Sequence, residues 1–135
     1  MDSTEQEVRM ELPCEPESVG DARRAVAELA ERLGVDDVDD VRIAVSEAVG
    51  NAIVHAYRDG NPGRIRVFAR EKRARLLVTV ADDGIGMAPH PGSEGLRIGI
   101  PLITKVCEDV RFASTDDGTT VSMSFAAHAA CSAEA

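Results

Sequence analysis

The segment from Val45 to Ala56 constrains the fold of this chain most strongly, because it is apolar on nearly every side and yet carries three polar side chains on one stripe. Glu47, Asn51 and His55 follow one another at intervals of four residues, so they share one face of a helix. Burial of an amide without a hydrogen-bond partner costs roughly 2–7 kcal/mol on transfer scales. The stripe therefore predicts a helix that faces a ligand, a metal ion or a wet cavity, although a satisfied polar network in the core would give the same pattern.

The overall composition favours a single acidic domain. The chain has 135 residues, of which 44% are hydrophobic and 29% charged, which suits one core and leaves no room for a second domain. A formal net charge of −9 argues against nucleic-acid binding and against adhesion to an acidic membrane, and it suits a basic protein partner better. Aromatic residues make up 3% of the chain, too few to build the stacking platforms of single-strand binders.

Cysteine usage and the start of the chain favour a cytoplasmic location. The three cysteines are odd in number and far apart, so they indicate neither a disulfide framework nor a metal cluster. The first residues are acidic without an apolar core, and no apolar run is long enough to cross a bilayer. We therefore expect a protein that is neither secreted nor membrane-spanning.

Hydropathy periods predict strands where apolar residues alternate and helices where they step by three and four. We expect Ser18 as the N-cap and Gly34 as the C-cap of the first helix, and the aspartates at 36–40 as caps of the second. The expected strands are 7–12, 64–70, 75–81, 110–113 and 119–125, and the expected helices are 18–33, 38–56 and 98–108. A single domain would then span residues 1–125, followed by a disordered tail of small residues over 126–135.

Three separated segments have the chemistry of a nucleotide site. They are the stripe with Glu47 and Asn51, the strand-end acid Asp82 followed by Gly84 and Gly86, and a glycine-rich loop that leads into the third helix. Glycines let a ligand approach the backbone closely, and the free amides of a helix N-terminus bind phosphate. Each segment alone has a structural alternative, since an acid before Gly-x-Gly is often a turn. Their order along the chain favours a nucleotide site.

Four short motifs resemble those of the GHKL ATPases. In chain order they are Glu47-Ala48-Val49-Gly50-Asn51-Ala52 for the N box, Asp82-Asp83-Gly84-Ile85-Gly86 and Gly95-Leu96-Arg97-Ile98-Gly99-Ile100-Pro101-Leu102-Ile103 for two glycine boxes, and Gly118-Thr119-Thr120-Val121 for the last. Motif order within a matching strand and helix context makes the resemblance specific. Within that superfamily, the short lid and the chain length are similar to the anti-sigma factor serine-protein kinases. The resemblance implies the Bergerat fold, an α/β two-layer sandwich with a mixed, mostly antiparallel sheet and three helices on one face.

The resemblance also implies roles for individual residues. Asn51 would hold the magnesium ion that bridges the ATP phosphates, because an amide oxygen suits this hard cation. Glu47 would be the general base toward a serine or threonine hydroxyl of a protein substrate. Asp82 would accept a hydrogen bond from the adenine amino group, with Thr119 in support. The two glycines that follow, Gly84 and Gly86, would leave room for the ring.

The second glycine box would form a lid over the phosphates, with Gly95, Arg97 and Gly99 among the ATP-binding residues. The family usually has a further glycine where this chain has Arg97. A side chain there restricts access to positive φ and would keep the lid farther from the phosphates. Its guanidinium could instead contact phosphate as a charged fork. The lid therefore predicts either a weakened kinase or one with an additional cation.

The resemblance implies an ATP- and magnesium-dependent anti-sigma factor that sequesters a sigma factor and phosphorylates an anti-anti-sigma protein. The alternative is a non-catalytic module of the same fold, in which ATP orders the lid and gates partner binding. A plain α/β protein without a nucleotide is a third interpretation. Arg23 and Arg24 on the first helix are either a solvated face or a docking surface, and a homodimer is expected only by analogy. His55 is interpreted as a packing or solvent-facing residue.

Overall fold

Five strands and two helices make up most of the described part of this computed structural model, which is residues 7–56, 64–82, 106–107, 109–115 and 118–127. In chain order the elements are β1 (Glu7–Pro13), α1 (Glu17–Leu33), α2 (Val38–Ala56), β2 (Arg64–Glu71), β3 (Arg75–Asp82), β4 (Asp109–Thr115) and β5 (Gly118–Ala126). These bounds confirm all five expected strands and the first two expected helices. Most of the third expected helix, 98–108, lies outside the described residues and stays a prediction.

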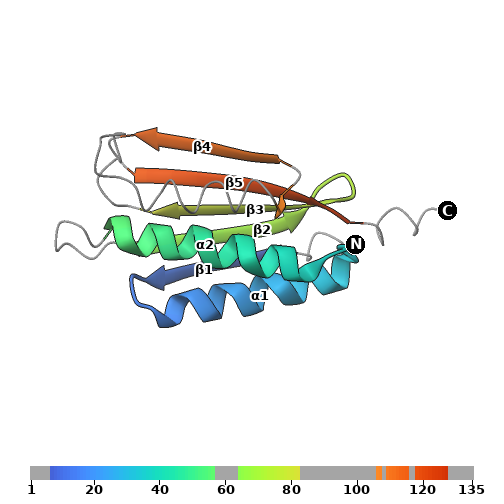
Figure 1. The fold of residues 1–135 in the computed structure, drawn as a ribbon, viewed down its shortest axis with the longest axis horizontal. Helices are drawn as coiled ribbons and strands as arrows, with labels where there is room; N and C mark the ends of the chain where they lie inside the picture. Colours follow the sequence, from blue (N-terminus) through green and yellow to red (C-terminus); the bar gives the residue numbers. More distant parts are fainter. Residues whose placement is uncertain (1–6, 57–63, 83–105, 108, 116–117, 128–135) are drawn as a thin grey trace.

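The strands form one sheet in the order β1-β2-β3-β5-β4. α1 packs on β1 and β2, whereas α2 packs on β2, β3 and β5, so both helices cover one face of the sheet (Figure 1). The expected two-layer sandwich is confirmed. The sheet is not mixed, however, because every pairing among the described strands is antiparallel. Short connections join β2 to β3 and β4 to β5. Neighbouring strands joined in this way are antiparallel, because a parallel pair needs a long crossover connection.

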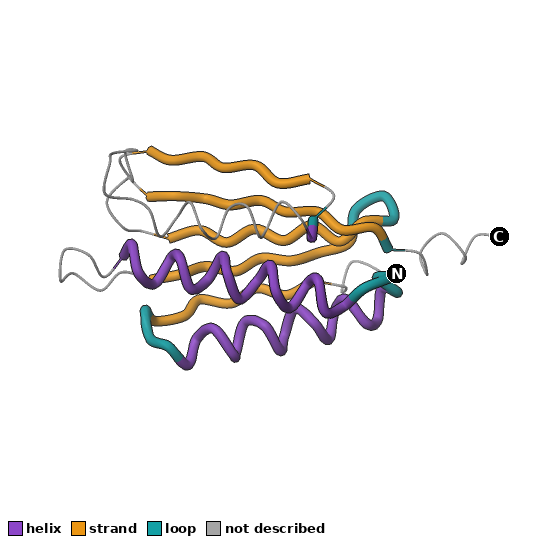
Figure 2. Tube along the Cα trace, viewed as in Figure 1, coloured by secondary structure: helices purple, strands orange, loops and turns teal. Residues whose placement is uncertain are grey.

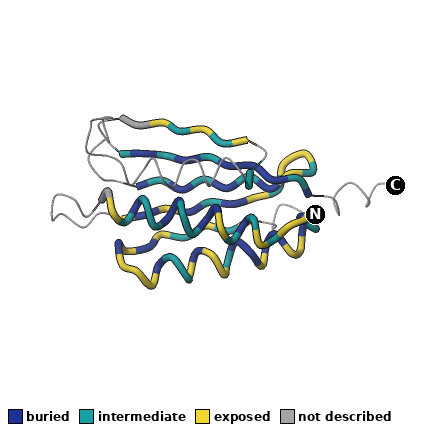
Figure 3. Tube along the Cα trace, in the orientation of Figure 1, coloured by how far each residue is buried: buried dark blue, intermediate teal, exposed yellow. Residues whose placement is uncertain are grey.

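The inner face of the sheet, under the helices, carries the apolar half of each strand. The register aligns Met10, Val67, Val80, Val121 and Phe112 in one row across all five strands. Buried positions alternate along β2 and β3 (Figure 3), as expected for strands with one covered face. The two helices add buried alanine, valine and leucine side chains to the same core.

The ends of the helices confirm two expected caps and correct a third. Gly34 has a φ of 76° and closes α1 in the left-handed conformation that glycine adopts most readily. At the start of α2 the backbone N–H of Asp40 donates to Oδ1 of Asp37 at 3.3 Å. Ser18 is not the N-cap of α1, because it is buried inside the helix and its hydroxyl donates to the carbonyl oxygen of Pro13 at 2.7 Å. A hydroxyl near a helix start can satisfy the preceding chain instead of the helix amides.

The end of β5 corrects the expected start of the tail. Ala126 belongs to β5, and Ala127 is buried and forms an isolated bridge with Val35. The expectation of disorder is therefore wrong for these two residues, because the strand continues beneath the loop between α1 and α2. Residues 128–135 lie outside the described residues. Among the described residues, no helix is long and apolar enough to cross a membrane.

The turn between β2 and β3 has a strained backbone. Arg73 and Ala74 have φ of 55° and 63°, and neither is a glycine. Two hydrogen bonds close the turn, from the N–H of Lys72 to the carbonyl of Arg75 at 2.8 Å and in the reverse direction at 3.0 Å. Figure 2 shows this connection as a short loop between two strands. Two left-handed residues in a two-residue loop match the twist of a hairpin, which is why this turn forms without the usual Asn-Gly pair.

Candidate functional site

One row across the inner face breaks the apolar pattern, at the end where β3 stops and β5 starts. In this row Leu12 and Ile65 are followed by Asp82 and Thr119. Asp82 and Thr119 each expose 6% of their surface, and both already take part in an interaction within the protein. A carboxylate and a hydroxyl side by side at the edge of an apolar surface provide oriented acceptors for a ligand N–H group.

The C-terminal half of α2 carries the second part of the site. Glu47 and Asn51 lie one turn apart and are both half-buried. Nδ2 of Asn51 is buried and has no hydrogen-bond partner in the described part of the chain. Leaving a buried amide unsatisfied costs roughly 1–3 kcal/mol. This cost favours a ligand that accepts a hydrogen bond from Asn51.

The far side of α2 is more open than the sequence predicts. Ile43 and Val54 expose 38% and 61% of their surface. The apolar character of this helix on nearly every side therefore does not mean burial on every side. The seam of Val41, Val45 and Val49 is fully buried, as expected.

The fold brings the two halves of the site to one end of the molecule. The C-terminal end of α2, the end of β3 and the start of β5 lie at the same end of the sheet in Figure 1, and α2 packs on both strands. Asp82 and Thr119 point from the inner face toward the helix layer because their row is continuous with the buried core. Asn51 and Glu47 lie in that layer.

Five of the predicted site residues lie outside the described part of the chain. They are Gly84, Gly86, Gly95, Arg97 and Gly99. The lid over the phosphates and the role of Arg97 therefore stay predictions. His55 lies in α2, but its side chain is outside the described set.

The described residues fit a magnesium ion that is held mainly by its nucleotide. They contain no group of three or more His, Cys, Asp or Glu side chains that would bind a metal on its own. Magnesium usually takes one or two protein ligands plus substrate phosphates and water. Asn51 can supply one such ligand through its side-chain oxygen, while its unsatisfied Nδ2 is a donor suited to a phosphate oxygen.

Arg23 and Arg24, the predicted docking residues, have different surroundings on α1. Nη1 of Arg23 donates to Oγ of Ser46 at 3.4 Å, so this guanidinium reaches the residue next to Glu47. Nη1 of Arg24 lies 3.5 Å from Oδ1 of Asp21, an exposed pair within α1. Exposed pairs of this kind are worth about 0.2–1 kcal/mol. A partner could therefore bind either side chain after breaking only a weak, exposed contact.

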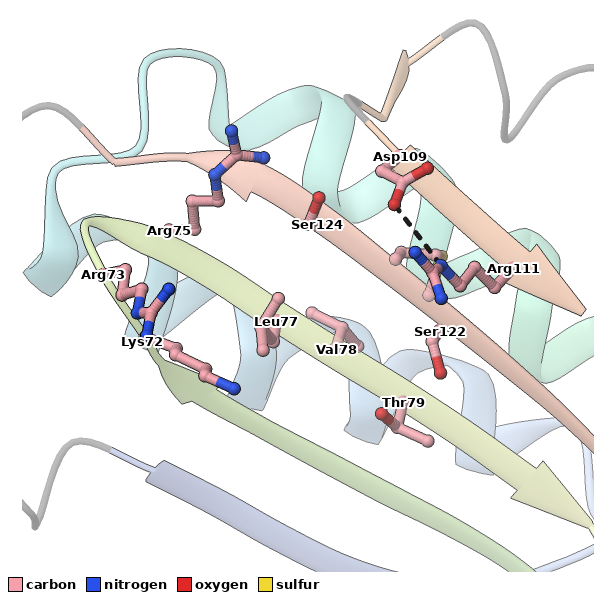
Figure 4. A pocket seen from close by; sticks show the side chains of 11 residues that line it. Lys72, Arg73, Arg75, Leu77, Val78, Thr79, Asp109, Arg111, Ser122 and Ser124 are labelled. Carbon is pink, nitrogen blue, oxygen red and sulfur yellow. Dashed lines mark ion pairs between the residues drawn. The ribbon is translucent and has the colours of Figure 1, made fainter.

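Sequence reasoning missed a cleft on the opposite, outer face of the sheet. The cleft has a volume of about 480 Å³ and is lined by Lys72, Arg73, Arg111 and Ser124 among others (Figure 4). It does not coincide with the site at Asp82, which is on the inner face. Alternating arginines in β2 were the available signal, but only the strand order shows which side chains of β3, β5 and β4 lie together.

The Cys107 thiol is chemically protected. Burial, and secondarily the negative charge of Asp40, raises the pKa of the Cys107 thiol to about 12. The pKa of Asp40 is itself raised by burial and by repulsion from Asp37 and Asp39. The Cys107 thiol is therefore a poor nucleophile. Cys14 is buried in the core.

A family model describes most of the chain. Residues 12–125 match the histidine kinase-like ATPase domain. That span contains every site residue predicted above.

Individual proteins share sequence and fold with the chain. The serine-protein kinase RsbW of Bacillus velezensis is 35% identical over 133 residues, which is 86% of this chain and 82% of that protein. RsbW of Bacillus subtilis is 31% identical over the same shares of the two chains. A crystal structure of the RsbU and RsbW domains of a Mycobacterium tuberculosis protein matches with a TM-score of 0.71 and 22% identity, covering 90% of this chain and 32% of that one. This last likeness concerns the fold alone.

Proposed function

The chain belongs to the family of histidine kinase-like ATPase domains and, within it, to the RsbW type of serine-protein kinase, and from this premise we propose which residues perform the transfer and on what. The reaction moves the γ-phosphoryl group of ATP to a serine or threonine hydroxyl of a partner protein and releases ADP. The proposal rests on one observation (Figure 1). The paired residues Asp82 and Thr119 lie at the same end of the molecule as the C-terminal half of α2, where Nδ2 of Asn51 has no hydrogen-bond partner in the described part of the chain.

Asp82 and Thr119 bind the adenine end of ATP. The carboxylate of Asp82 accepts a hydrogen bond from the exocyclic amino group, and the apolar residues Leu12 and Ile65 of the same row keep water from competing. A charge-assisted hydrogen bond in such a place discriminates adenine from a base with a carbonyl at that position. The hydroxyl of Thr119 stands opposite in register and orients the acid.

Asn51 binds the phosphate end. Its side-chain oxygen would ligate Mg²⁺, and the ion would neutralise charge on the phosphates during transfer. Its Nδ2, which lacks a partner among the described residues, donates to a phosphate oxygen. The amide therefore fixes the position of the phosphates relative to Glu47, one turn earlier on the helix.

Glu47 is the general base. Its carboxylate accepts the proton of the attacking hydroxyl as the oxygen of that hydroxyl bonds to the γ-phosphorus and the bond to the ADP oxygen breaks. The hydrogen bond from Arg23 to Ser46 links α1 to the helix that carries Glu47. Substrate binding near Arg23 and Arg24 would then lie close to the reacting groups.

The partners follow from the type of kinase. We propose that the protein substrate is an anti-anti-sigma protein and that the second partner is a sigma factor, held without direct contact to nucleic acid. Arg23 and Arg24 provide exposed cations for either partner. The domain of residues 1–125 would act in the cytoplasm, where its thiols stay reduced, and a homodimer remains part of the proposal by analogy.

The test is phosphoryl transfer from labelled ATP. The protein is mixed with magnesium and ATP labelled at the γ-phosphate, together with an anti-anti-sigma protein captured from the source cell by pull-down. Label on a serine or threonine of the captured protein is the expected result. ATP binding without transfer would instead support the nucleotide-gated switch, the alternative that Arg97 in the lid favours. Absence of any thermal shift with magnesium and ATP would exclude both, because saturation at 100 times Kd adds about 2.7 kcal/mol.

A further inference from the structure

The outer face of the sheet, which faces away from α1 and α2, is basic although the chain is acidic. The outward positions of the five strands together with the β2–β3 turn carry eight Lys or Arg residues and three acids. We call these positions the basic face. They contain more than half of the fifteen Lys and Arg residues in a chain whose net charge is −9. Six of the eight come close together in the sequence, as Arg64, Arg66 and Arg70 on β2 and Lys72, Arg73 and Arg75 at the turn.

The cleft of about 480 Å³ lies at the turn end of the basic face. Its lining from β3 and β5 includes the short side chains of Thr79 and Ser122, which stand opposite each other in register. Lys72 and Arg73 border it at the turn, and Arg111 borders it on β4 (Figure 4). Volumes of ~300–1,000 Å³ are typical of ligand pockets, so this cleft admits a few side chains but not a folded domain.

An unsatisfied hydroxyl lies in the wall of this cleft. Ser124 exposes 7% of its surface, and its buried Oγ has no hydrogen-bond partner in the described part of the chain. Its neighbours in register are Leu77 on one side and Asp109 on the other. A buried hydroxyl without a partner is unfavourable and is relieved by a ligand acceptor such as a carboxylate oxygen.

We propose that the cleft binds an acidic segment of a partner protein, with two or more Asp or Glu side chains. Arg73, Lys72 and Arg111 would pair with the carboxylates, and Ser124 would donate to one of them. Asp109 is the one acid among the residues lining the cleft, and its Oδ2 lies 3.7 Å from Nε of Arg111, which reduces its repulsion of the ligand. Several cations around one cleft suit a segment with two or more carboxylates better than a single small anion.

Two other occupants fit less well. Nucleic acid would meet the strong negative charge of the remaining surface, and the outward strand positions offer Phe68 as their one aromatic ring for stacking. A second copy of the chain would place one basic face against another, and the excess of Lys and Arg over acids would then repel. An acidic protein segment removes both difficulties.

The cleft is distinct from the ATP site. It lies on the other face of the sheet and at the other end of β3, since Arg75 and Asp82 are the first and last residues of that strand. A partner held there would leave the inner face accessible. The inference goes beyond the proposed kinase function and does not depend on it.

The experiment measures binding of a labelled oligoglutamate peptide by fluorescence anisotropy at about 0.15 M salt. We expect saturable binding that Arg73→Glu weakens about 5–10-fold and that Asp109→Asn tightens about 2–3-fold. The matched control is Arg64→Glu, which makes the same charge change on the same face but at the far end of β2 from the cleft. This variant should weaken binding less than 2-fold, because salt screens a distant charge. Asp109→Asn also separates an effect of charge from a loss of structure, because a variant with a damaged cleft would bind the peptide more weakly and not more tightly.

Several outcomes would overturn the proposal. They are no saturable peptide binding, equal losses in Arg73→Glu and Arg64→Glu, or tighter binding of a labelled single-stranded oligonucleotide than of the peptide. A stable dimer in sedimentation that Arg73→Glu dissociates would identify the basic face as an interface between copies instead. Binding of inorganic phosphate at millimolar concentration, without binding of the peptide, would reduce the cleft to a site for small anions.

Discussion

Asp82, the last residue of β3, stands opposite Thr119, the second residue of β5, in the only row of the described inner face where an acid and a hydroxyl replace apolar side chains on adjacent strands. The other inner-face rows of these two strands pair Val80 with Val121, Val78 with Met123 and Leu76 with Phe125. The polarity of the inner face therefore changes at one end of two central strands, beside the end of α2. This placement supports the proposal that the two residues form a ligand site rather than a turn.

The first prediction concerns adenine binding. Asp82→Asn keeps the size of the side chain but removes the charge that strengthens the hydrogen bond to the amino group. A hydrogen bond to a charged group is worth about 1.5–3 kcal/mol, so ATP affinity should fall at least about 10-fold. Isothermal titration with magnesium and ATP measures this. Asp109→Asn on β4 makes the same chemical change away from the site and should leave ATP affinity unaltered. Unchanged affinity in Asp82→Asn would remove Asp82 from adenine recognition.

The second prediction separates chemistry from binding. Glu47→Gln should slow phosphoryl transfer by roughly 10²–10⁴-fold, the usual effect of losing a general base, while the thermal shift with magnesium and ATP persists. Single-turnover transfer to the captured partner protein gives the rate. A Glu47→Gln variant that transfers at the full rate would show that another group takes the proton. Asn51→Leu is the companion variant, and it should abolish the thermal shift itself.

The third prediction tests the corrected role of Ser18. Ser18→Ala leaves the carbonyl of Pro13 without its buried donor, which should reduce the free energy of unfolding by about 1–2 kcal/mol in urea denaturation. Ser18→Asp distinguishes the two interpretations. At an N-cap, Asp is as good as Ser, but here its carboxylate would face the carbonyl oxygen of Pro13 and be buried. A stability of Ser18→Asp equal to that of the native chain would restore the capping role.

Local chemistry explains which parts of the fold could be predicted from the sequence. Gly34 and Asp37 end and begin helices through contacts with residues three or four positions away, and both were identified correctly. Asp82 and Thr119 were brought together by a resemblance between short motifs, and their pairing in register agrees with it. The roles given to Glu47 and Asn51 are consistent with their position on α2, but they stay proposals.

Long-range pairing explains what the sequence did not reveal. The cleft on the outer face exists because β5 pairs with both β3 and β4, which places Ser124 beside Leu77 and Asp109, residues that lie far apart in the chain. Alternation alone shows which side chains point outward, but not which strand lies next to which. The net charge also gave no indication of the basic face, because it does not depend on which strands are neighbours. A net charge of −9 says nothing about how Lys and Arg are distributed.

The fourth prediction follows from the raised pKa of Cys107. Its thiol has a pKa of about 12 in the folded chain against an ordinary value of 9.0, so at pH 8–9 it holds about 10³-fold less thiolate than in urea. Pulsed alkylation with iodoacetamide, read by mass spectrometry, should show a correspondingly slow reaction that becomes fast on unfolding. The raised pKa of Cys107 also makes the folding stability depend on pH. The unfolded thiol ionises near pH 9 and the folded one near 12, so folding stability is lost as the pH rises through this window. Cys107→Val should be less sensitive to that rise.

The final prediction uses the strained turn between β2 and β3. Ala74 has a φ of 63°, a conformation that costs a residue with a Cβ about 1–2 kcal/mol and costs glycine almost nothing. Ala74→Gly should therefore raise the free energy of unfolding, by about 0.5–1 kcal/mol after allowance for the greater freedom of glycine in the unfolded chain. Ala69→Gly is the matched control, because Ala69 is buried in the middle of β2 and the same change there should destabilise the protein. Denaturation midpoints for both variants decide the matter, and a loss of stability in Ala74→Gly would mean that the left-handed turn is not a source of strain.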